Sequence, residues 1–441
     1  MGPKNLYLQT FGCQMNVYDS ERIRQLLAAR NYRLVQDPSE ADLILLNTCS
    51  VRAKPEQKVY SALGRFRALK KKKPELIIGL AGCLAQQEGE KFLQRFPYLG
   101  FVLGTKEFGR INEVLDDLEV FGKRGLATSL EGRIDPYASL LFSPPPSKVT
   151  AFVSIMQGCD NFCSFCIVPF VRGREVSRPS REILEEVRTL AAQGVREVTL
   201  LGQNVNSYGN KTSGEMSFSE LLETVQEIQG IERIRFTTSH PKDLSRDLIR
   251  SFGRLSKLCE HIHLPLQSGS NRILKRMNRG YSREEYLERV NELRQACPEI
   301  SITTDMIVGF PGEKEADFQS TLDMVEQVQC DDLFSFKYSD RPYTRAADFP
   351  DKVPEEVSRQ RLMELQALQR KITFQRNRIW EGREVEVLVE GRSKVSVEEN
   401  MGRTRTNHIV NFPGEPDLIG SLVWLKIEKV FAHSLRGARV F

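Results

Sequence analysis

The chain has 441 residues and a mass of 50.4 kDa, and 40% of its residues are hydrophobic, so two to three domains with packed cores are expected. No stretch approaches the roughly 18 apolar residues that span a bilayer, and the first residues form no apolar signal segment, so we expect a cytoplasmic protein without a membrane partner. The net charge of +5 permits a polyanionic partner without demanding one.

The first 120 residues repeat one pattern three times: an apolar strand, a Cys at its end, and a polar turn that leads into a helical stretch. Strands are expected at 6–10, 43–47 and 77–81. The three thiols that follow them are Cys13, Cys49 and Cys83. A spacing of about 35 residues suits a strand plus a crossover helix, which makes the strands parallel and brings their carboxyl ends to one edge. The pattern therefore predicts that the three thiols converge, with three buried thiols there by chance as the alternative.

Residues 121–148 are predicted to link this domain, residues 1–120, to the next. Residues 121–125 interrupt the helical pattern, and the segment from Ser143 to Ser147 holds three consecutive prolines that form a stiff spacer. Within the first domain, a basic run extends from Arg65 to Lys73. Either a solvated helix end or an RNA contact would explain this run.

Strands and helices alternate again in residues 149–377, where six apolar runs predict a partial (β/α)6 barrel. The loop after the first of these runs carries Cys159, Cys163 and Cys166, with no fourth Cys and no His nearby in the sequence. Structural zinc is almost always closed by four protein ligands, whereas a cubane iron-sulfur cluster on three thiolates leaves one iron for an outside ligand. The loop favours the cluster, and structural thiols or a zinc knuckle completed from elsewhere remain the alternative.

The last part of the chain begins with a long charged helix from Glu355 to Trp380. From Glu381 onward the sequence alternates, which predicts a small all-β barrel as the last domain, residues 378–441. The whole is an α/β protein with three domains. The turn from Gly402 to His408 gathers cations and hydrogen-bonding side chains that suit phosphate contacts. Composition alone favours RNA binding by this module only weakly.

Taken together, these features resemble the methylthiotransferases of the radical S-adenosylmethionine (SAM) superfamily, over residues 4–441. The Cys-x3-Cys-x2-Cys loop resembles the superfamily signature, and the carboxyl-terminal module is similar to the TRAM domain of that family. Four further segments carry the resemblance: Thr10 to Asn16, Leu201 to Gly209, Leu264 to Ser270 and Thr304 to Glu313. Gln14 to Asn16 after the first Cys, with Gly402 to Gly414, resembles the MiaB-type branch, which methylthiolates isopentenyl-adenosine beside the tRNA anticodon.

The resemblance implies two 4Fe-4S clusters. Cys159, Cys163 and Cys166 would ligate the first, whose open iron binds SAM and delivers the electron that generates a deoxyadenosyl radical. Cys13, Cys49 and Cys83 would ligate a second cluster that presents a methylated sulfur to carbon 2 of the adenine. The implied partners are a tRNA anticodon stem-loop, an electron donor protein of the flavodoxin or ferredoxin type and a sulfur donor, with the chain acting as a monomer.

Five strand-end residues are candidate SAM contacts, although a structural turn or cap would explain each about as well. They are Gln203, Gln267, Ser268, Asp305 and Gly309. One departure is visible: the family usually has Arg-Pro-Gly-Thr near the last barrel strand, and this chain has Tyr343 at the Gly position, which leaves the role of Arg341 open. The alternatives are a methylthiotransferase of the threonylcarbamoyl-adenosine or ribosomal-protein branch and a non-catalytic RNA-binding metalloprotein.

Overall fold

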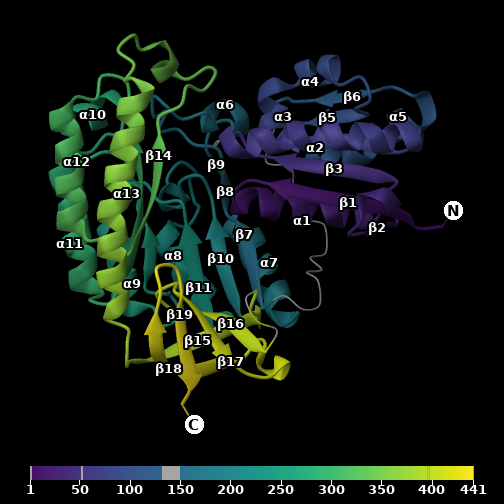
Figure 1. The fold of residues 1–441 in the computed structure, drawn as a ribbon. Coiled ribbons are helices and arrows are strands. Elements are labelled where there is room, and N and C mark those ends of the chain that lie inside the picture. Colours follow the sequence, from purple (N-terminus) through teal and green to yellow (C-terminus); the bar gives the residue numbers. More distant parts are fainter. Residues whose placement is uncertain (1, 51–52, 132–148, 395, 397, 441) are drawn as a thin grey trace.

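The fold consists of three units joined in chain order, an amino-terminal sheet domain, a partial barrel and a small closed β-barrel (Figure 1). The computed structural model describes residues 2–50, 53–131, 149–394, 396 and 398–440. The proline-rich segment from Ser143 to Ser147, expected within the linker, lies outside these residues. Among the described residues, no helix has both the length and the apolar character needed to cross a membrane.

The amino-terminal unit is a six-stranded parallel sheet in the order β2-β1-β3-β4-β5-β6, with helices on both faces. Its strands are β1 (Lys4–Phe11), β2 (Tyr32–Leu34), β3 (Leu43–Thr48), β4 (Ile77–Gly82), β5 (Phe101–Leu103) and β6 (Gly125–Ala127). Its helices are α1 (Gln14–Ala28), α2 (Ala53–Lys72), α3 (Cys83–Glu88), α4 (Glu90–Arg95) and α5 (Ile111–Phe121). Every residue of β3 is buried, which is why its sequence is a continuous apolar run rather than an alternating one.

The strand β6 lies inside the segment that the sequence predicts to be a linker. It pairs in parallel with β5, and Ala127 packs in the core on one face of the sheet. The amino-terminal sheet therefore extends to Ala127, beyond the predicted domain end at residue 120. The three residues are too few to show a strand pattern in the sequence.

The central unit has six parallel strands in two three-stranded sheets, β11-β10-β7 and β12-β13-β14, linked by a parallel bridge between Ile234 and Leu258. The six strands are β7 (Thr150–Ser154), β10 (Glu197–Leu201), β11 (Arg233–Thr237), β12 (His261–His263), β13 (Ser301–Val308) and β14 (Asp332–Lys337). The short strands β8 (Met156–Gln157) and β9 (Val176–Ser177) pair with each other beside the three-Cys loop. The predicted partial barrel of six strands is confirmed.

Helices cover the outside of this barrel, and their starts follow from the sequence. They are α6 (Val168–Arg172), α7 (Ser180–Ala192), α8 (Phe218–Gln226), α9 (Arg246–Arg254), α10 (Asn271–Arg276), α11 (Arg283–Ala296), α12 (Glu315–Val328) and α13 (Glu355–Arg378). The hydroxyls of Ser217 and Ser282 each accept a hydrogen bond from the backbone of the first turn, and the carboxylate of the Glu three residues later accepts one from the amide of the Ser. These capping boxes satisfy amide groups that a helix start leaves unpaired.

The carboxyl-terminal unit is a closed five-stranded barrel, β15-β16-β17-β19-β18, around an apolar core. Its strands are β15 (Glu384–Arg392), β16 (Glu399–Thr404), β17 (Ile409–Pro413), β18 (Leu422–Val430) and β19 (Leu435–Arg439). A side chain at Gly402 would approach the carbonyl oxygen of Leu388 to 2.3 Å, so β15 and β16 can cross only with Gly there. This closure removes free strand edges.

The turn between β16 and β17 lies against the base of the central barrel, and the RNA contact that its sequence suggests stays a prediction. Arg233 and Arg235, both buried, donate hydrogen bonds to backbone carbonyl oxygens of residues 403–405. Arg405 in turn forms a bidentate ion pair with Glu260 at 2.7–3.0 Å. The buried Arg233 and Arg235 and the ion pair of Arg405 therefore fix the two domains together, because buried guanidinium groups need such partners. Arg403 instead pairs with Glu390 within the small barrel.

Candidate active site

The three-Cys loop follows β8 at the carboxyl-terminal end of the barrel, where a sharp backbone turn starts it. Gly158 has φ +81°, and a side chain there would meet the carbonyl oxygen of Arg174 at 2.1 Å. The amide of Cys159 donates to the carbonyl oxygen of Gly173, and that of Cys166 to the carbonyl oxygen of Cys163. All three Cys residues are of intermediate exposure, in contrast to the buried Cys49 and Cys83.

Contacts from other barrel loops hold the three-Cys loop in shape. Ser164 donates through its amide to the carbonyl oxygen of Met277 at 2.9 Å and through its hydroxyl to that of Arg276 at 2.8 Å. Asp160 accepts from Arg174 and Lys211, two cations outside the loop. The loop is thus fixed by neighbours whatever binds to its thiols, which is what a preorganised ligand set requires.

Arg279 places a buried positive charge beside these thiols. Its side chain is 5% exposed and donates to the sulfur of Cys163 at 3.3 Å, to the carbonyl oxygen of Pro265 and to the hydroxyl of Tyr281. Burial raises the pKa of Cys159 to about 11 and that of Cys166 to about 12, while the charge of Arg279 opposes both shifts. A buried guanidinium next to three thiols suits an anionic metal-thiolate cluster, since it offsets the thiolate charge.

The described residues contain no cluster of three or more Cys, His, Asp or Glu side chains close enough to hold one metal ion. The part of the chain that the structure describes therefore offers no preformed zinc site. In a polynuclear cluster each thiolate binds a different iron, so its sulfurs stand further apart than the ligands of one ion. The donor set fits a three-thiolate iron-sulfur cluster.

The second set of thiols, Cys13, Cys49 and Cys83, meets at the carboxyl edge of three adjacent strands, β1, β3 and β4. A side chain at Gly12 would lie 2.7 Å from the β-carbon of Cys49, so Gly12 allows the first two turns to approach. A hydrogen bond from Cys49 lowers the pKa of Cys13 to about 6, and the charge of Arg172 acts in the same direction. The predicted convergence of these strand ends is present in the structure.

Two Asn side chains brace these turns. Asn16 accepts from the amide and thiol of Cys13, and its own amide group donates to Asn47 and to the carbonyl oxygen of Thr48. Both Asn side chains are fully buried. They hold the ends of β1 and β3 together.

The helix α6 connects the two sets of thiols. It begins two residues after Cys166. Ile167, directly before the helix, and Val171 within it pack against Cys83 of the amino-terminal domain. Arg172 at its end is buried and forms a 2.6 Å ion pair with Asp19 of α1. The same five-residue helix thus contacts the second set of thiols and continues directly from the first.

Four of the five candidate SAM contacts follow strand ends as the sequence predicts, whereas Asp305 lies inside β13, and each has a visible structural partner. Gln203 accepts from the amide of Gly158, directly before Cys159. Gln267 adopts φ +76° and bridges to β13 through backbone hydrogen bonds with Asp305 and Ile307. Ser268 is 1% exposed and accepts from the amide of Ser270. These contacts place the loops around the site, and direct contact with SAM remains a prediction.

Asp305 and Gly309 occupy β13 and its end. Asp305 points to the same side as His263 of β12, with 3.6 Å between their side chains. Gly309 has φ +71°, and a side chain there would meet the hydroxyl of Ser358 at 2.1 Å, so α13 packs directly on this turn. For Gly309 the structure thus supplies a packing reason that is independent of any ligand.

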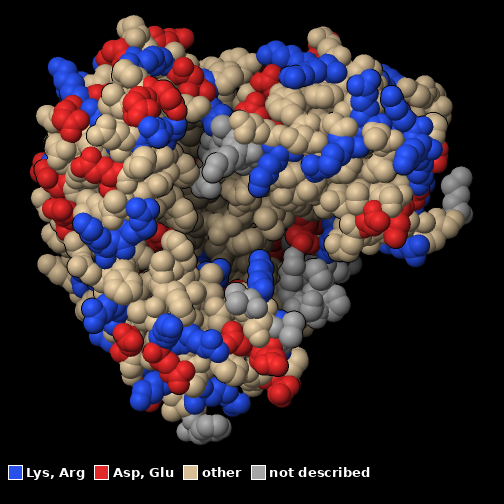
Figure 2. Space-filling model, viewed as in Figure 1, with Lys and Arg blue, Asp and Glu red and all other residues tan. Residues whose placement is uncertain are grey.

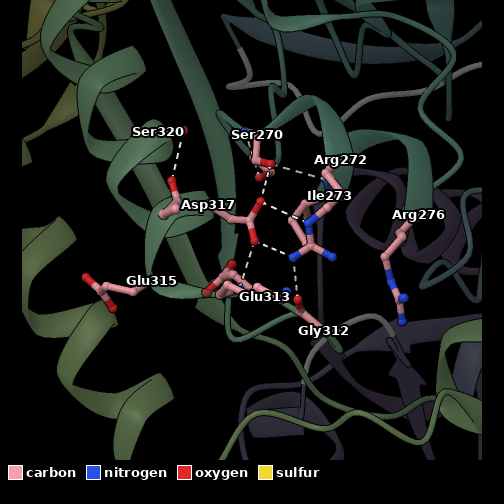
Figure 3. Close-up of polar contacts among 12 residues, drawn as sticks. Ser270, Arg272, Ile273, Arg276, Gly312, Glu313, Glu315, Asp317 and Ser320 are labelled. Atoms are coloured by element: carbon pink, nitrogen blue, oxygen red, sulfur yellow. Dashed lines mark hydrogen bonds and ion pairs between the residues drawn. The ribbon is translucent and has the colours of Figure 1, made fainter.

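The loops after β12 and β13 are tied together by the carboxylate of Asp317 (Figure 3). Asp317 accepts from the hydroxyl of Ser270 at 2.6 Å, from the amide of Lys314 at 2.8 Å and from Arg272, which also donates to the carbonyl oxygen of Gly312. Glu313 accepts from the amide of Gly309 and from the buried Arg361. The rim of the barrel is therefore braced by two ion pairs, of which the one between Glu313 and Arg361 is buried, and not by apolar packing alone.

Sequence reasoning missed Arg172 and Arg279. Neither residue adjoins a candidate ligand in the sequence, and Arg is usually exposed, so nothing in the sequence indicates that these two are buried beside thiols. Only Arg172 stands near a recognisable motif, six residues after Cys166. The remaining three Cys residues, Cys259, Cys297 and Cys330, have no ligand spacing in the sequence and are buried packing residues.

Comparison with known proteins places the chain in a family. Residues 5–104 match an uncharacterized protein family, UPF0004, residues 153–325 the radical SAM superfamily and residues 380–440 the TRAM domain. A protein of Syntrophus aciditrophicus is 54% identical over 98% of this chain and 94% of its own length, and one of Geobacter metallireducens is 55% identical over 99% and 98%. Both are named tRNA-2-methylthio-N(6)-dimethylallyladenosine synthase.

Solved structures of lower identity share the fold. The radical S-adenosylmethionine methyltransferase TsrM from Kitasatospora setae is 14% identical, with a TM-score of 0.58 over 78% of this chain and 75% of its own. The cobalamin-dependent radical enzyme OxsB is 13% identical, with a TM-score of 0.51 over 83% of this chain and 56% of its own. With relatives more than half identical over almost their whole length and with all three domain families in order, the chain belongs to the tRNA-2-methylthio-N(6)-dimethylallyladenosine synthase family.

Proposed function

We propose that this protein adds a methylthio group to carbon 2 of an isopentenyl (dimethylallyl) adenosine next to the anticodon of tRNA. The observation that supports this most is the junction at α6, where Cys83 of one thiol set packs against the residue that follows Cys166 of the other. A reaction that first activates a ring carbon and then attaches sulfur to it needs both centres within reach of one substrate atom.

Cys159, Cys163 and Cys166 would hold one 4Fe-4S cluster with SAM, and Cys13, Cys49 and Cys83 would hold a second cluster. When bound, these groups supply the one-electron chemistry that an unactivated ring carbon requires, together with the sulfur and the methyl group. Arg279 would offset the charge of the first thiolate set, and Arg172 that of the second. Gln203, Gln267, Ser268, Asp305 and Gly309 would line or shape the SAM site.

The RNA would enter the hollow between the amino-terminal domain and the barrel (Figure 2). Lys and Arg side chains border this hollow on the side of the amino-terminal domain (Figure 2). Phosphate contacts of this kind position a nucleic acid without reading its sequence. The basic run from Arg65 to Lys73 lies at the other end of α2, where Lys73 pairs with Asp42 before β3, remote from Cys49. The target base must leave its stack to reach the thiols, since the chemistry cannot occur inside a stacked loop. The proposal further includes a cytoplasmic monomer, served by a flavodoxin- or ferredoxin-type electron donor and a sulfur donor.

Iron analysis of anaerobically reconstituted protein tests the two clusters. We expect about eight irons per chain in the wild type and about four in each of two triple variants, C159A/C163A/C166A and C13A/C49A/C83A. The first variant should lose SAM cleavage, whereas the second should keep SAM cleavage but form no methylthio product on a dimethylallyl-adenosine stem-loop. Four irons or bound zinc in the wild type would overturn the two-cluster assignment.

The choice of substrate is tested by competition. The wild type should modify a stem-loop that contains dimethylallyl-adenosine and leave a threonylcarbamoyl-adenosine stem-loop and ribosomal protein unmodified, as read by mass spectrometry. Modification of either alternative substrate at a rate comparable to that of the dimethylallyl-adenosine stem-loop would assign the protein to another branch of the methylthiotransferases. Tight RNA binding without any SAM turnover would support a binding protein instead.

A further inference from the structure

Tyr343 holds a backbone conformation that its side chain disfavours. Its φ is +68°, in the left-handed region that Gly adopts freely and that a bulky residue enters only at an energetic cost. The ring is 61% exposed, so burial in a core does not offset that cost. Strain of this kind in an ordered loop is a reason to look for function.

The ring of Tyr343 lies against the ring of Phe170 from α6. Their centroids are 6.1 Å apart at an interplanar angle of 35°, and Phe170 is itself 39% exposed. We name these two residues the aromatic pair. Together they form an open apolar surface contributed by two segments that are remote in the sequence.

The aromatic pair is fixed beside the three-Cys loop. Phe170 lies on the helix that begins two residues after Cys166. Three residues beyond Tyr343, the amide of Ala346 donates to the carbonyl oxygen of Ser164 at 2.8 Å, and Ala346 packs with Phe165 of the same loop. On the other side, Arg341 lies 3.8 Å from Glu56 of α2. The aromatic pair therefore stands at the rim where the barrel meets the amino-terminal domain.

A cation accompanies the aromatic surface. Arg345, two residues after Tyr343, is exposed and forms no ion pair among the described residues. Exposed aromatic rings next to an uncommitted cation are the combination that binds single-stranded nucleic acid, in which bases stack and phosphates are neutralised. A protein segment would instead need several hydrogen-bond partners for its backbone. These two side chains offer apolar ring faces and a single hydroxyl group.

We infer that the aromatic pair stacks an unpaired nucleobase next to the target adenosine and so holds the anticodon loop open above the three-Cys loop. This inference rests on the proposed function and names the residue that positions the substrate. When the target base leaves its stack, its neighbour loses one stacking face, and Tyr343 offers a replacement at the rim of the site. Tyr343 is thus a positioning residue rather than a catalytic one.

The test compares Tyr343→Gly with the matched control Tyr343→Phe in anaerobically reconstituted full-length protein. Binding of a fluorescein-labelled stem-loop that contains dimethylallyl-adenosine is measured by anisotropy without reductant. We expect Tyr343→Gly to bind about tenfold more weakly and Tyr343→Phe to bind as the wild type does. Because Gly adopts this φ without strain, the variant should keep its melting temperature, its iron content and its RNA-independent SAM cleavage.

Stem-loops that lack the base 5′ or 3′ of the target complete a double-mutant cycle. For one of the two positions, loss of the base should weaken binding to the wild type about tenfold and leave binding to Tyr343→Gly unchanged. Equal affinity of Tyr343→Gly and wild type, or additive effects at both positions, would overturn the inference. Failure of the wild type to bind or modify the intact stem-loop would instead overturn the proposed function, so the two failures are distinguishable.

Discussion

Arg279 illustrates how one side chain sets the electrostatics of the three-Cys loop. It is buried, it donates to Cys163, and its remaining donors reach Pro265 and Tyr281. A positive charge at this distance favours the more negative state of any cluster on the loop, which is the reduced one. The sequence gives no indication of this role, because Cys163 and Pro265 lie on other loops that only the fold brings to Arg279.

Replacing Arg279 by Leu should therefore make the cluster harder to reduce. We expect the midpoint potential to fall by on the order of 60 mV, a tenfold change in the equilibrium for one electron. Electron paramagnetic resonance of poised samples measures it. Arg279→Lys keeps the charge and should restore most of the potential. An unchanged potential in Arg279→Leu at full iron content would contradict this prediction.

His240 makes stability depend on pH. Burial lowers its pKa to about 2, helped by the nearby charges of Arg279 and Lys242, so the folded imidazole stays neutral. The unfolded chain takes up a proton near pH 6.5, so stability falls as the pH drops below that value. Between pH 7 and pH 5 this group should cost about 2 kcal/mol of unfolding free energy.

Urea unfolding at pH 7 and pH 5 measures this contribution. His240→Gln should reduce the loss of stability between the two pH values by about 2 kcal/mol relative to the wild type. Substitution of the exposed His433 by Gln is the control and should leave the pH dependence unchanged. Identical pH dependence in His240→Gln and wild type would show that the folded imidazole takes up a proton.

At the scale of elements, the rim of the barrel depends on the pairing of Glu313 with Arg361. Both side chains are buried, their atoms are 2.8 Å apart, and the pair joins the turn after β13 to α13. Burial raises the pKa of Glu313, and Arg361 acts against this shift. A buried ion pair contributes little relative to apolar packing, but loss of one partner leaves an uncompensated charge.

Arg361→Leu should accordingly destabilise the barrel by about 3–5 kcal/mol. The double variant Glu313→Gln, Arg361→Leu removes the orphaned charge and should recover part of that loss. Thermal unfolding of the wild type, the single variant and the double variant measures the loss of stability in each. Equal losses in the single and double variants would indicate that packing against α13, not the charge pair, carries the effect.

The domain arrangement follows from a few buried cations. Arg233 and Arg235 reach from β11 to the turn after β16, and Arg405 reaches back to Glu260, so the small barrel closes the base of the central one (Figure 1). At the other end, Arg172 joins α6 to Asp19 of α1. Both junctions use charged groups, which fix orientation more strictly than an apolar contact does.

Weakening the junction between the small barrel and the central barrel should release the small barrel without unfolding it. We expect Arg405→Ala to cost about 2 kcal/mol of docking free energy and to raise the rate of proteolysis between α13 and β15 roughly thirtyfold. Arg436→Ala, which removes an ion pair within the small barrel, is the matched control and should cleave as the wild type does. Equal cleavage of both variants would mean that Arg405 does not hold the junction.

The sequence by itself determined the strands, the barrel and both thiol sets, because these depend on local pattern. Apolar runs mark the longer strands, capping residues mark several helix starts, and the chain order of parallel strands brings Cys13, Cys49 and Cys83 to one edge without further information. Only the tertiary structure decided that β6 completes the first sheet and that the turn from Gly402 to His408 docks on the barrel instead of facing outward. It also placed Arg172 and Arg279 beside the thiols and Tyr343 against Phe170. These features depend on which distant surfaces meet, and no local pattern in the chain encodes that meeting.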